Sequence, residues 1–405
     1  MLRVEQTADS CVKCNICNTV CPVSAVTDLF PGPKYEGPQG QRFRAGLDGD
    51  ASPDYSLDYC SGCGLCTQAC PEGVMVAEIN QVAREKLVRS RGGLRLRDKL
   101  VCRPTLMARL ARPVAPLANL ALANPAVRWL LEKVMGVHRK APMPRFSVMT
   151  FRSWARSHRP PTDPARTVAY FHGCATQEYE PEVGAALVRV LERSGVRVTY
   201  PKQYCCGLPL ISNGDFDAAR RFATRQMASL EGAARDPGVI VANSTSCGMT
   251  LKAKYRELLG MDDDATQAVS GAVYDVCEYL LELDDQDALD RSFAPMHARA
   301  VYHPPCQLMA HGVGTPALDL LAMVPGLVVE RSRAGCCGIA GTYGTKVEKY
   351  QIAMDVGRTL FDQVAEGRPD FVVCDSETCR WHIAKATGLP VYHPVQVLDR
   401  AYSAS

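Results

Sequence analysis

The sequence predicts an α/β fold with an added α-helical part: a helical N-terminal module followed by two homologous α/β domains with mainly parallel sheets. Three observations lead to this fold class. Two runs of four cysteines stand near the N-terminus, a cysteine pattern occurs twice in the rest of the chain, and each copy alternates apolar strands with amphipathic helices. We expect the module in residues 1–83, a basic linker in 84–160, and the two α/β domains in 161–290 and 291–405.

The composition indicates a globular protein that is unusually rich in cysteine. With 47% hydrophobic and 22% charged residues, the 405-residue chain is ordinary for a protein of two or three domains. No apolar leader precedes the first of the 19 cysteines, so we expect a reducing compartment, where regular cysteine spacing points to metal. No run of 18 apolar residues is present, and we expect no membrane span.

The N-terminal runs read CVKCNICNTVCP from Cys11 and CSGCGLCTQACP from Cys60. Both match C-x2-C-x2-C-x3-C-P, the bacterial two-cluster ferredoxin run, in which the fourth cysteine ligates the other [4Fe–4S] cluster. The two predicted metal sites are therefore Cys11, Cys14, Cys17 with Cys70, and Cys60, Cys63, Cys66 with Cys21. Structural zinc sites are the alternative, because zinc also accepts four thiolates. We expect short helices joined by a Pro/Gly-rich loop.

The second cysteine pattern repeats at an offset of 131 to 132 residues. Its copies contain Cys174, Cys205, Cys206 and Cys247, and then Cys306, Cys336, Cys337 and Cys379. Each of these cysteines follows a predicted strand, and ligands of parallel sheets bind beyond the carboxyl ends of strands. Adjacent cysteines project in different directions and so reach different irons of one polynuclear cluster. Buried structural cysteines are the alternative.

These stretches resemble a known family. The Cys-Cys-Gly turns resemble those of the cysteine-rich CCG domain found in heterodisulfide reductase and related oxidoreductases. The whole chain is similar to the iron–sulfur subunits of anaerobic glycerol-3-phosphate dehydrogenases. The more specific stretches are PGPKYEGPQGQR (31–42), FRSWARS (151–157), FHGC (171–174), CCGIAGTYG (336–344) and DSETCRW (375–381). The glycolate oxidase iron–sulfur subunit shares the architecture.

The resemblance implies an electron-transfer subunit with two cubane [4Fe–4S] clusters and one or two further, non-cubane clusters held by the CCG cysteines. The chain departs from the family pattern at Ser244 and Ser376, where the superfamily has the leading cysteine of a C-x2-C pair. Cys374 could replace the second of these ligands, because alternate residues of a strand share a face. The first copy has Ala242 at that position and no replacement.

The resemblance also implies partners. A flavoprotein subunit would oxidise sn-glycerol 3-phosphate, and a menaquinone-type acceptor would receive the electrons at the cytoplasmic face of the inner membrane. The sequence shows no dinucleotide fingerprint and no nucleophile–base constellation, so we expect no flavin in this chain and no substrate oxidation by it alone. A glycolate or lactate oxidase complex, or direct catalysis at the CCG cysteines, is the alternative.

The linker explains the charge of the chain. Residues 84–159 contain 18 Lys and Arg against three acids, although the whole chain has a net charge of only +3. An apolar side formed by Leu106, Leu110, Leu117, Leu120 and residues 129–131 is typical of helices that lie peripherally on an anionic membrane surface. Packing of these residues within the protein is the alternative. We expect no nucleic-acid binding, because no aromatic-rich platform accompanies the charge.

Overall fold

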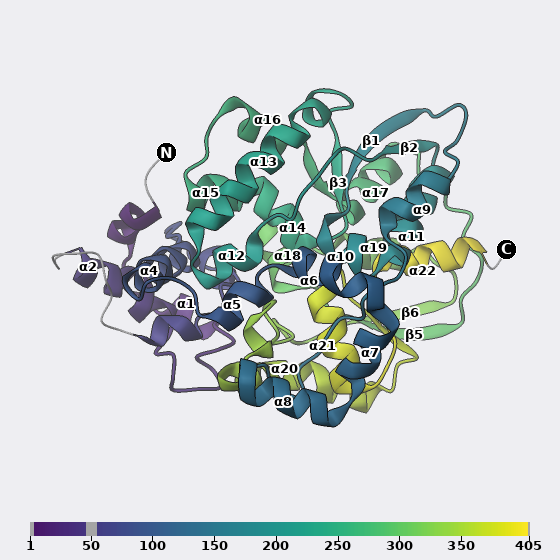
Figure 1. The fold of residues 1–405 in the computed structure, drawn as a ribbon. Helices are drawn as coiled ribbons and strands as arrows, with labels where there is room; N and C mark the ends of the chain where they lie inside the picture. The colour runs from purple at the N-terminus through teal and green to yellow at the C-terminus, as the bar shows by residue number, and fades with distance from the viewer. Residues whose placement is uncertain (1–3, 46–54, 404–405) are drawn as a thin grey trace.

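Two four-stranded parallel sheets organise the chain in a computed structural model that describes residues 4–45 and 55–403 (Figure 1). The first sheet has the order β2-β1-β3-β4 and the second β6-β5-β7-β8. The strands are β1 Arg166–Phe171, β2 Val196–Thr199, β3 Ile240–Ala242, β4 Val273–Asp275, β5 Ala298–Tyr302, β6 Leu327–Arg331, β7 Phe371–Val373 and β8 Val391–Tyr392. The predicted fold class is confirmed, and both copies of the repeat have the same topology.

Amphipathic helices connect the parallel strands and bury their apolar sides. Helix α11 (Pro181–Arg193) begins with proline, whose fixed φ suits a first helical position, and buries Val183, Leu187 and Leu191. Helices α13 (Phe216–Arg235) and α20 (Val347–Gly367) are the long helices between β2 and β3 and between β6 and β7. The helical periodicity of the sequence therefore located the crossover helices correctly.

Both sheets contribute to one hydrophobic core. A cluster of buried side chains includes Val168 and Leu187 from the first copy and Tyr302 and Val373 from the second. Helix α11 also packs against the C-terminal helix α22 (Pro394–Ser403), as Figure 1 shows. The two α/β domains, which we name the CCG domains after their Cys-Cys-Gly turns, are therefore joined by a buried interface.

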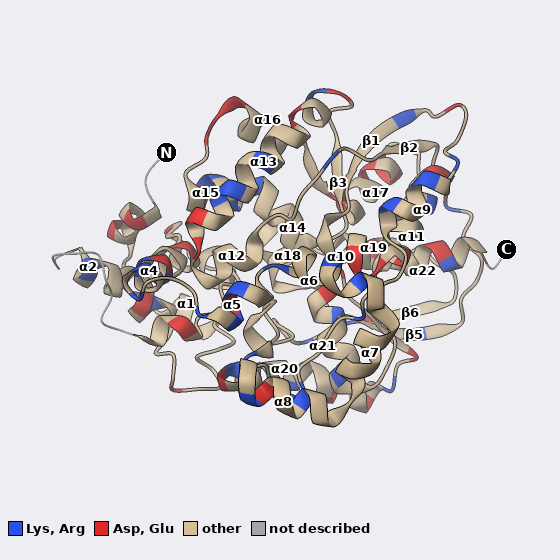
Figure 2. Cartoon of the chain, in the orientation of Figure 1, with Lys and Arg blue, Asp and Glu red and all other residues tan. Residues whose placement is uncertain are grey.

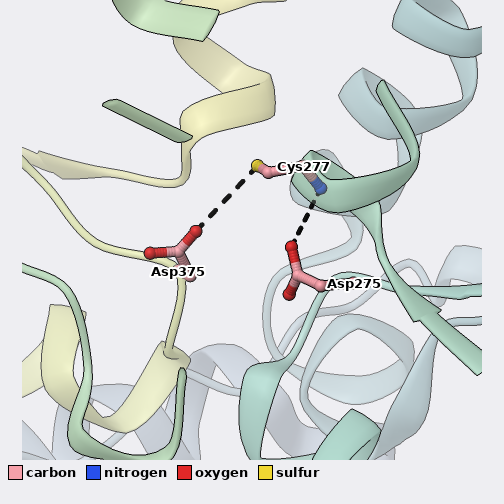
Figure 3. Close-up of side chains that lie close together, drawn as sticks. All are labelled: Asp275, Cys277 and Asp375. Atoms are coloured by element: carbon pink, nitrogen blue, oxygen red, sulfur yellow. Dashed lines mark hydrogen bonds between the residues drawn. The ribbon is translucent and has the colours of Figure 1, made fainter. Parts of the chain in front are cut away.

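The strand ends at this interface reach across it reciprocally. Asp275 at the end of β4 has a carboxylate oxygen within 4.8 Å of one of Asp375, which follows β7 (Figure 3). His393 occupies the equivalent position after β8, and its Nε2 lies 2.8 Å from the carbonyl oxygen of Asn243, which follows β3. Cys277 adds an Sγ contact of 4.0 Å to Asp375. Equivalent strand ends are thus in contact in both halves of the interface, through two carboxyl groups in one half and through a histidine ring and a carbonyl oxygen in the other.

The N-terminal module is a set of short helices against one longer helix, α4 (Val76–Ser90). The short ones are η1 Val4–Ser10, α1 Ile16–Thr19, η2 Tyr35–Gln39, α2 Gly40–Arg44, η3 Tyr55–Tyr59 and α3 Leu65–Gln68. The segment predicted as a loop between the cysteine runs is partly helical, in η2 and α2. Proline and glycine there break the helix without abolishing it, since Gly37 has non-helical angles inside η2. Residues 46–54 of the predicted loop lie outside the described part.

The linker forms helices that contact both of the α/β domains. They are α5 Leu96–Val101, α6 Pro104–Ala111, α7 Ala115–Ala123, α8 Pro125–Met135 and α9 Phe151–Ser157. Helix α6 packs on α10 (Gly173–Glu178) of the first CCG domain, and Arg97 makes two hydrogen bonds of 2.7 and 2.9 Å to Glu348 of the second. Within the described residues, no helix has the length and apolar character that crossing a membrane requires.

The linker cations do not all face outward. Arg112 pairs with the buried carboxylate of Glu178, and buried Arg128 donates to the carbonyl oxygens of residues 138, 139 and 141. Some of the cations counted in the sequence are therefore bound to acceptors inside the protein. The sequence could not separate these cations from the exposed ones, because their partners are distant or on the backbone.

Candidate iron–sulfur sites

The cysteines of the two N-terminal runs gather in two groups, and each group takes its fourth cysteine from the other run. Cys70 lies with the first three cysteines of the first run, and Cys21 with those of the second. Asn15 (φ 120°) and Gly64 (φ 88°) adopt left-handed angles just before α1 and α3, which places Cys17 and Cys66 early in those helices. The arrangement predicted from the run spacing is therefore the one the fold brings together.

The two groups differ in burial. In the first group Cys14 is exposed, whereas Cys60, Cys63 and Cys66 of the second group are all buried. Burial raises the pKa of Cys63 to about 12, and the neighbouring thiol of Cys336 contributes to this rise. Once ionised, the four thiolates of one group repel one another. Such a donor set suits a cationic iron–sulfur core, which replaces the protons of the thiols.

The first CCG domain brings its four predicted cysteines to one edge of its sheet. Cys174 lies in α10 after β1, the Cys205–Cys206 turn precedes α12 (Leu208–Asn213), and Cys247 lies in α14 (Thr245–Met249) after β3. The Sγ atoms of Cys174 and Cys205 are 3.9 Å apart, and those of Cys206 and Cys247 are 3.4 Å apart. Thiols from three loops thus converge beyond the carboxyl ends of the strands, as predicted.

The second CCG domain repeats this geometry with a fifth thiol. Cys336 contacts Cys306 and Cys337, and Cys337 contacts Cys379. Hydrogen bonds from neighbouring thiols lower the pKa of Cys336, as they do for the equivalent Cys205 in the first domain. Cys374 contacts Cys379 but does not line the cavity onto which the other four open. It therefore stands behind the group, on the side of the sheet.

The serines that depart from the family pattern are helix caps. Ser244 is the N-cap of α14, and its hydroxyl accepts from the amide of Cys247 at 3.5 Å. Ser376 is the N-cap of α21 (Glu377–Thr387) and hydrogen-bonds the Cys379 thiol. Serine is favoured at this position because its oxygen can satisfy an amide of the first turn, as that of Ser244 does, whereas Ser376 makes no such cap bond and contacts the thiol instead. Each serine thus orients the cysteine three residues after it.

Gly338 is required by helix packing. A Cβ atom at this residue, whose φ is 95°, would lie 1.9 Å from the carbonyl oxygen of Ala353 in α20. Its amide also donates to Cys336 Sγ at 3.3 Å. The glycine of the Cys-Cys-Gly turn therefore lets α20 approach the thiol group closely.

One cavity connects the two CCG thiol groups. It has a volume of about 280 Å³, and eight of the CCG cysteines line it, four from each domain. Linker residues close the remaining side, among them Met107 of α6 and Phe146, and Tyr179 and Trp381 add aromatic walls. A mostly apolar space of this kind, bounded by thiol groups on two sides, can hold a small apolar molecule between them.

The second N-terminal group adjoins the second CCG group. Cys63, Cys306 and Cys336 form a single buried cluster in which side chains from the N-terminal module and the second CCG domain are in contact. Gln307 supports this contact by donating to the carbonyl oxygens of Gly62 and Cys63 at 3.3 Å. Cys17 and Cys66 share another buried cluster, so the two N-terminal groups and the second CCG group form a continuous series.

Sequence reasoning missed two sets of residues beside these sites. Arg84 and Lys349 lie near Cys60, and the buried carboxyls of Asp275 and Asp375 lie at the domain interface. Burial and the neighbouring Asp375 raise the pKa of Asp275 to about 8, while burial raises that of Asp375 to about 6. No local pattern marks them, because their partners are far away in the chain.

Comparisons with known proteins agree with this architecture. Residues 7–74 match the 4Fe-4S dicluster domain model, and residues 168–252 and 300–384 match the model of the cysteine-rich CCG domain. The B subunit of a fumarate reductase (CoM/CoB) from Methanothermobacter marburgensis is 26% identical over 97% of this chain and 72% of its own length. The glycolate oxidase iron–sulfur subunit of Escherichia coli K12 is 24% identical over 99% and 95%.

A higher identity extends over both whole chains. The C subunit of the anaerobic glycerol-3-phosphate dehydrogenase of Escherichia coli K12 is 36% identical over 97% of this chain and 98% of its own length. The N-terminal 4Fe-4S dicluster module and the tandem CCG domains account for the cysteine groups described above. The chain therefore belongs to the family of the C subunit of anaerobic glycerol-3-phosphate dehydrogenase.

Proposed function

We propose that this chain is the electron-transfer subunit of a membrane-associated anaerobic glycerol-3-phosphate dehydrogenase. A flavoprotein partner would oxidise sn-glycerol 3-phosphate, and a menaquinone-type acceptor would receive the electrons. The observation that carries the proposal is the continuity of the thiol groups, from the partly exposed Cys11 group to the Cys60 group and on to Cys306 and Cys336. The [4Fe–4S] centres would supply one-electron transfer, and the protein would hold them in this order.

The donor can be tested on the complex purified anaerobically with its flavoprotein subunits. Glycerol 3-phosphate should bleach the visible iron–sulfur absorption within the turnover time, whereas glycolate and lactate should not. Bleaching by glycolate or lactate alone would assign the chain to the alternative oxidase complexes. Absence of bleaching by all three would leave no support for the electron-transfer role.

The CCG cysteines are proposed as ligands of further clusters. Cys174, Cys205, Cys206 and Cys247 would hold one, and Cys306, Cys336, Cys337 and Cys379 another, with Cys374 as an extra thiol near the second. The fit rests on their convergence and on burial, which is complete for all but the half-buried Cys174. Thiols crowded together in this way suit a bound cationic centre that replaces their protons. The iron content of the purified chain and of cysteine variants tests this ligand set.

A second candidate function is direct reduction of a small acceptor in the cavity. The cavity supports it, since cysteines of both CCG domains line its walls. The chain alone, reduced chemically, would then transfer electrons to a water-soluble quinone analogue or to a disulfide. Reduction of the disulfide but not the quinone would favour the heterodisulfide-reductase-like alternative, and reduction of the quinone alone would favour the main proposal.

Membrane attachment is proposed for the linker. Eight exposed apolar side chains on and between α6, α7 and α8 form what we name the apolar face: Leu106, Leu110, Val114, Leu117, Leu120, Trp129, Leu130 and Val134. Helix α7 carries no charged residue, as its uniform tan colour in Figure 2 shows. Exposed cations lie on the same segment: Arg109, Lys133, Arg139, Lys140 and Arg145. Apolar area next to cations is the combination that binds anionic lipid surfaces.

Vesicle flotation tests this attachment. The chain should float with vesicles that contain phosphatidylglycerol, and less with purely zwitterionic vesicles. The double substitution Leu117→Glu and Leu120→Glu should weaken vesicle binding at least tenfold. Burial of a leucine side chain contributes about 1.5–3 kcal/mol, and about 1.4 kcal/mol corresponds to a tenfold change in affinity. Val328→Glu, at an exposed valine of the second sheet, is the matched control. Equal flotation of all three proteins would contradict the proposal.

A further inference from the structure

Arg84 is a buried cation beside the second N-terminal thiol group. The residue is 6% exposed, in helix α4. It donates from Nη2 to the carbonyl oxygens of Leu57 (2.5 Å) and Cys60, and from Nη1 to that of Ser212 at 2.7 Å. Its Nε is buried and lacks a hydrogen-bond partner among the described residues. The hydrogen-bond acceptors of the guanidinium close to Cys60 are thus all neutral. The Asp58 carboxylate lies near enough for Arg84 to lower its pKa, but no carboxylate of the described residues is hydrogen-bonded to Arg84.

The electrostatic effect of Arg84 is visible on its neighbours. Burial raises the pKa of the Cys60 thiol, and Arg84 is the foremost of the charges that oppose this rise. Lys349 of α20 also lies near Cys60, and its Nζ donates to the carbonyl oxygen of Asp58. Burial lowers the pKa of Lys349, whereas arginine side chains in general keep their charge in proteins. Arg84 is therefore the permanent positive charge next to Cys60.

The first N-terminal group offers a direct contrast. Arg42 donates to the carbonyl oxygens of Ala8 at 2.8 Å and Cys11 at 3.3 Å, so each run has an arginine on the backbone of its first cysteine. Arg42, however, is exposed, and Cys14 of that group is exposed as well. Water screens a charge at the surface far more than a buried one. The two groups therefore differ in the effective charge that they experience.

We propose that Arg84 makes the Cys60 centre the more oxidising of the two N-terminal centres, which draws electrons to the centre in contact with the second CCG domain. The inference rests on the [4Fe–4S] occupancy that the proposed function assigns to these cysteines. One-electron reduction adds one negative charge to such a centre, and a buried cation nearby favours the reduced form. Arg84 acts as a positioning and tuning residue, since it binds the backbone of Cys60 and not the thiol.

A redox titration monitored by electron paramagnetic resonance tests the proposal on the full chain, purified anaerobically and reduced chemically. Cys14→Ser identifies the signal of the first centre and Cys66→Ser that of the Cys60 centre, because each of these cysteines belongs to one group only. In the unmutated chain, the signal of the Cys60 centre should have the higher midpoint potential of the two. Arg84→Gln should lower that potential by about 59 mV, which is a tenfold change in a one-electron equilibrium, and leave the first centre unchanged.

Two control variants separate charge from structure. Arg84→Lys keeps the charge and should keep the potential within a third of the Gln shift, whereas a purely structural role predicts equal shifts for both variants. Arg42→Gln should move neither potential appreciably. A lower potential for the Cys60 centre in the unmutated chain would overturn the proposal even if Arg84→Gln fails to fold. The titration uses no donor or acceptor, so the electron-transfer partners can be wrong while this result stands, and absence of iron would refute the occupancy itself.

Discussion

Cys63 of the N-terminal module and Cys336 of the second CCG domain lie in one buried cluster, although most of the chain separates them in sequence. The contact makes the second N-terminal group and the Cys-Cys-Gly turn neighbours. No comparable contact is found among the described residues between the N-terminal cysteines and the thiols of the first CCG domain. The repeat is therefore symmetric in its cysteine pattern and asymmetric in its place in the protein.

The iron content should show whether the adjacent cysteines hold a cluster. Two cubane clusters account for about eight irons, and one or two more clusters for about twelve to sixteen. Changing both Cys336 and Cys337 to serine should remove about four irons, because thiolates of the second CCG group are then lost. Cys102→Ala is the matched control, since Cys102 is buried but belongs to none of the four cysteine groups. A content of about eight irons in every protein would mean that the CCG domains hold none.

The cavity can be blocked without touching a cysteine. Met107 lines the cavity, whereas the preceding residue, Leu106, is 44% exposed and does not. Met107→Trp should reduce turnover with a quinone analogue at least tenfold, because the larger side chain occupies the space of the acceptor. Bleaching by the donor complex should stay unchanged. Leu106→Trp should leave both rates as they are, and equal rates for Met107→Trp would place the acceptor elsewhere.

Gly338 provides a test of the close packing between α20 and the Cys-Cys-Gly turn. Gly338→Ala should cost more than about 4 kcal/mol of unfolding free energy, since its Cβ would meet the Ala353 carbonyl oxygen at 1.9 Å. Gly341→Ala also has a positive φ, 63°, but has no atom within 4 Å of the new Cβ. Its cost should be about 1–2 kcal/mol. Urea denaturation measures both, and equal costs would show that backbone strain alone explains the glycine.

The buried Asp275 should make stability depend on pH. Its folded-state pKa of about 8, raised by burial and by Asp375, exceeds the value of about 3.9 expected in the unfolded chain. Between those values the folded state binds more protons, so the free energy of unfolding should fall as pH rises from about 4 to about 8. Asp275→Asn does not titrate and should therefore gain stability relative to the parent protein over this window.

Melting temperatures at about pH 5 and pH 8 measure this effect. The relative gain of Asp275→Asn should exceed about 1.4 kcal/mol, the value of one pKa unit. Asp264→Asn, at an exposed carboxyl in the same domain, should show a constant offset from the parent protein at both pH values. Parallel curves for Asp275→Asn as well would show that the pair is not protonated in the folded state.

The sequence predicted the features that follow from the spacing of its cysteines and the periodicity of its apolar residues. The exchange of Cys21 and Cys70 between the runs, the parallel sheets and the strand-end positions of the CCG cysteines all follow from local patterns. The roles of Ser244 and Ser376 as helix caps needed the backbone, because serine at that position also fits an open loop. The lipid contact of the apolar face stays a prediction.

Long-range contacts were beyond the sequence. The sequence around Arg84 does not indicate that Ser212 and Cys60 accept its hydrogen bonds. The sequence around Asp275 likewise does not indicate that Asp375 lies beside it. The repeat is no guide to these contacts, because Asp275 aligns with His393 and the two side chains contact different partners. Such contacts arise from the docking of three parts, which no single part encodes.

The same docking bears on the order in which the protein is made. The N-terminal module leaves the ribosome first, and N-terminal parts of multidomain proteins generally fold first. The surroundings of Cys63 and Arg84, however, are supplied by Ser212, Cys306 and Cys336, which are synthesised much later. The Cys11 group can thus be completed early, whereas the Cys60 group stays open to solvent until the last domain has been translated. Of the two N-terminal centres, the Cys60 centre is therefore expected to complete its iron loading last, after release of the whole polypeptide.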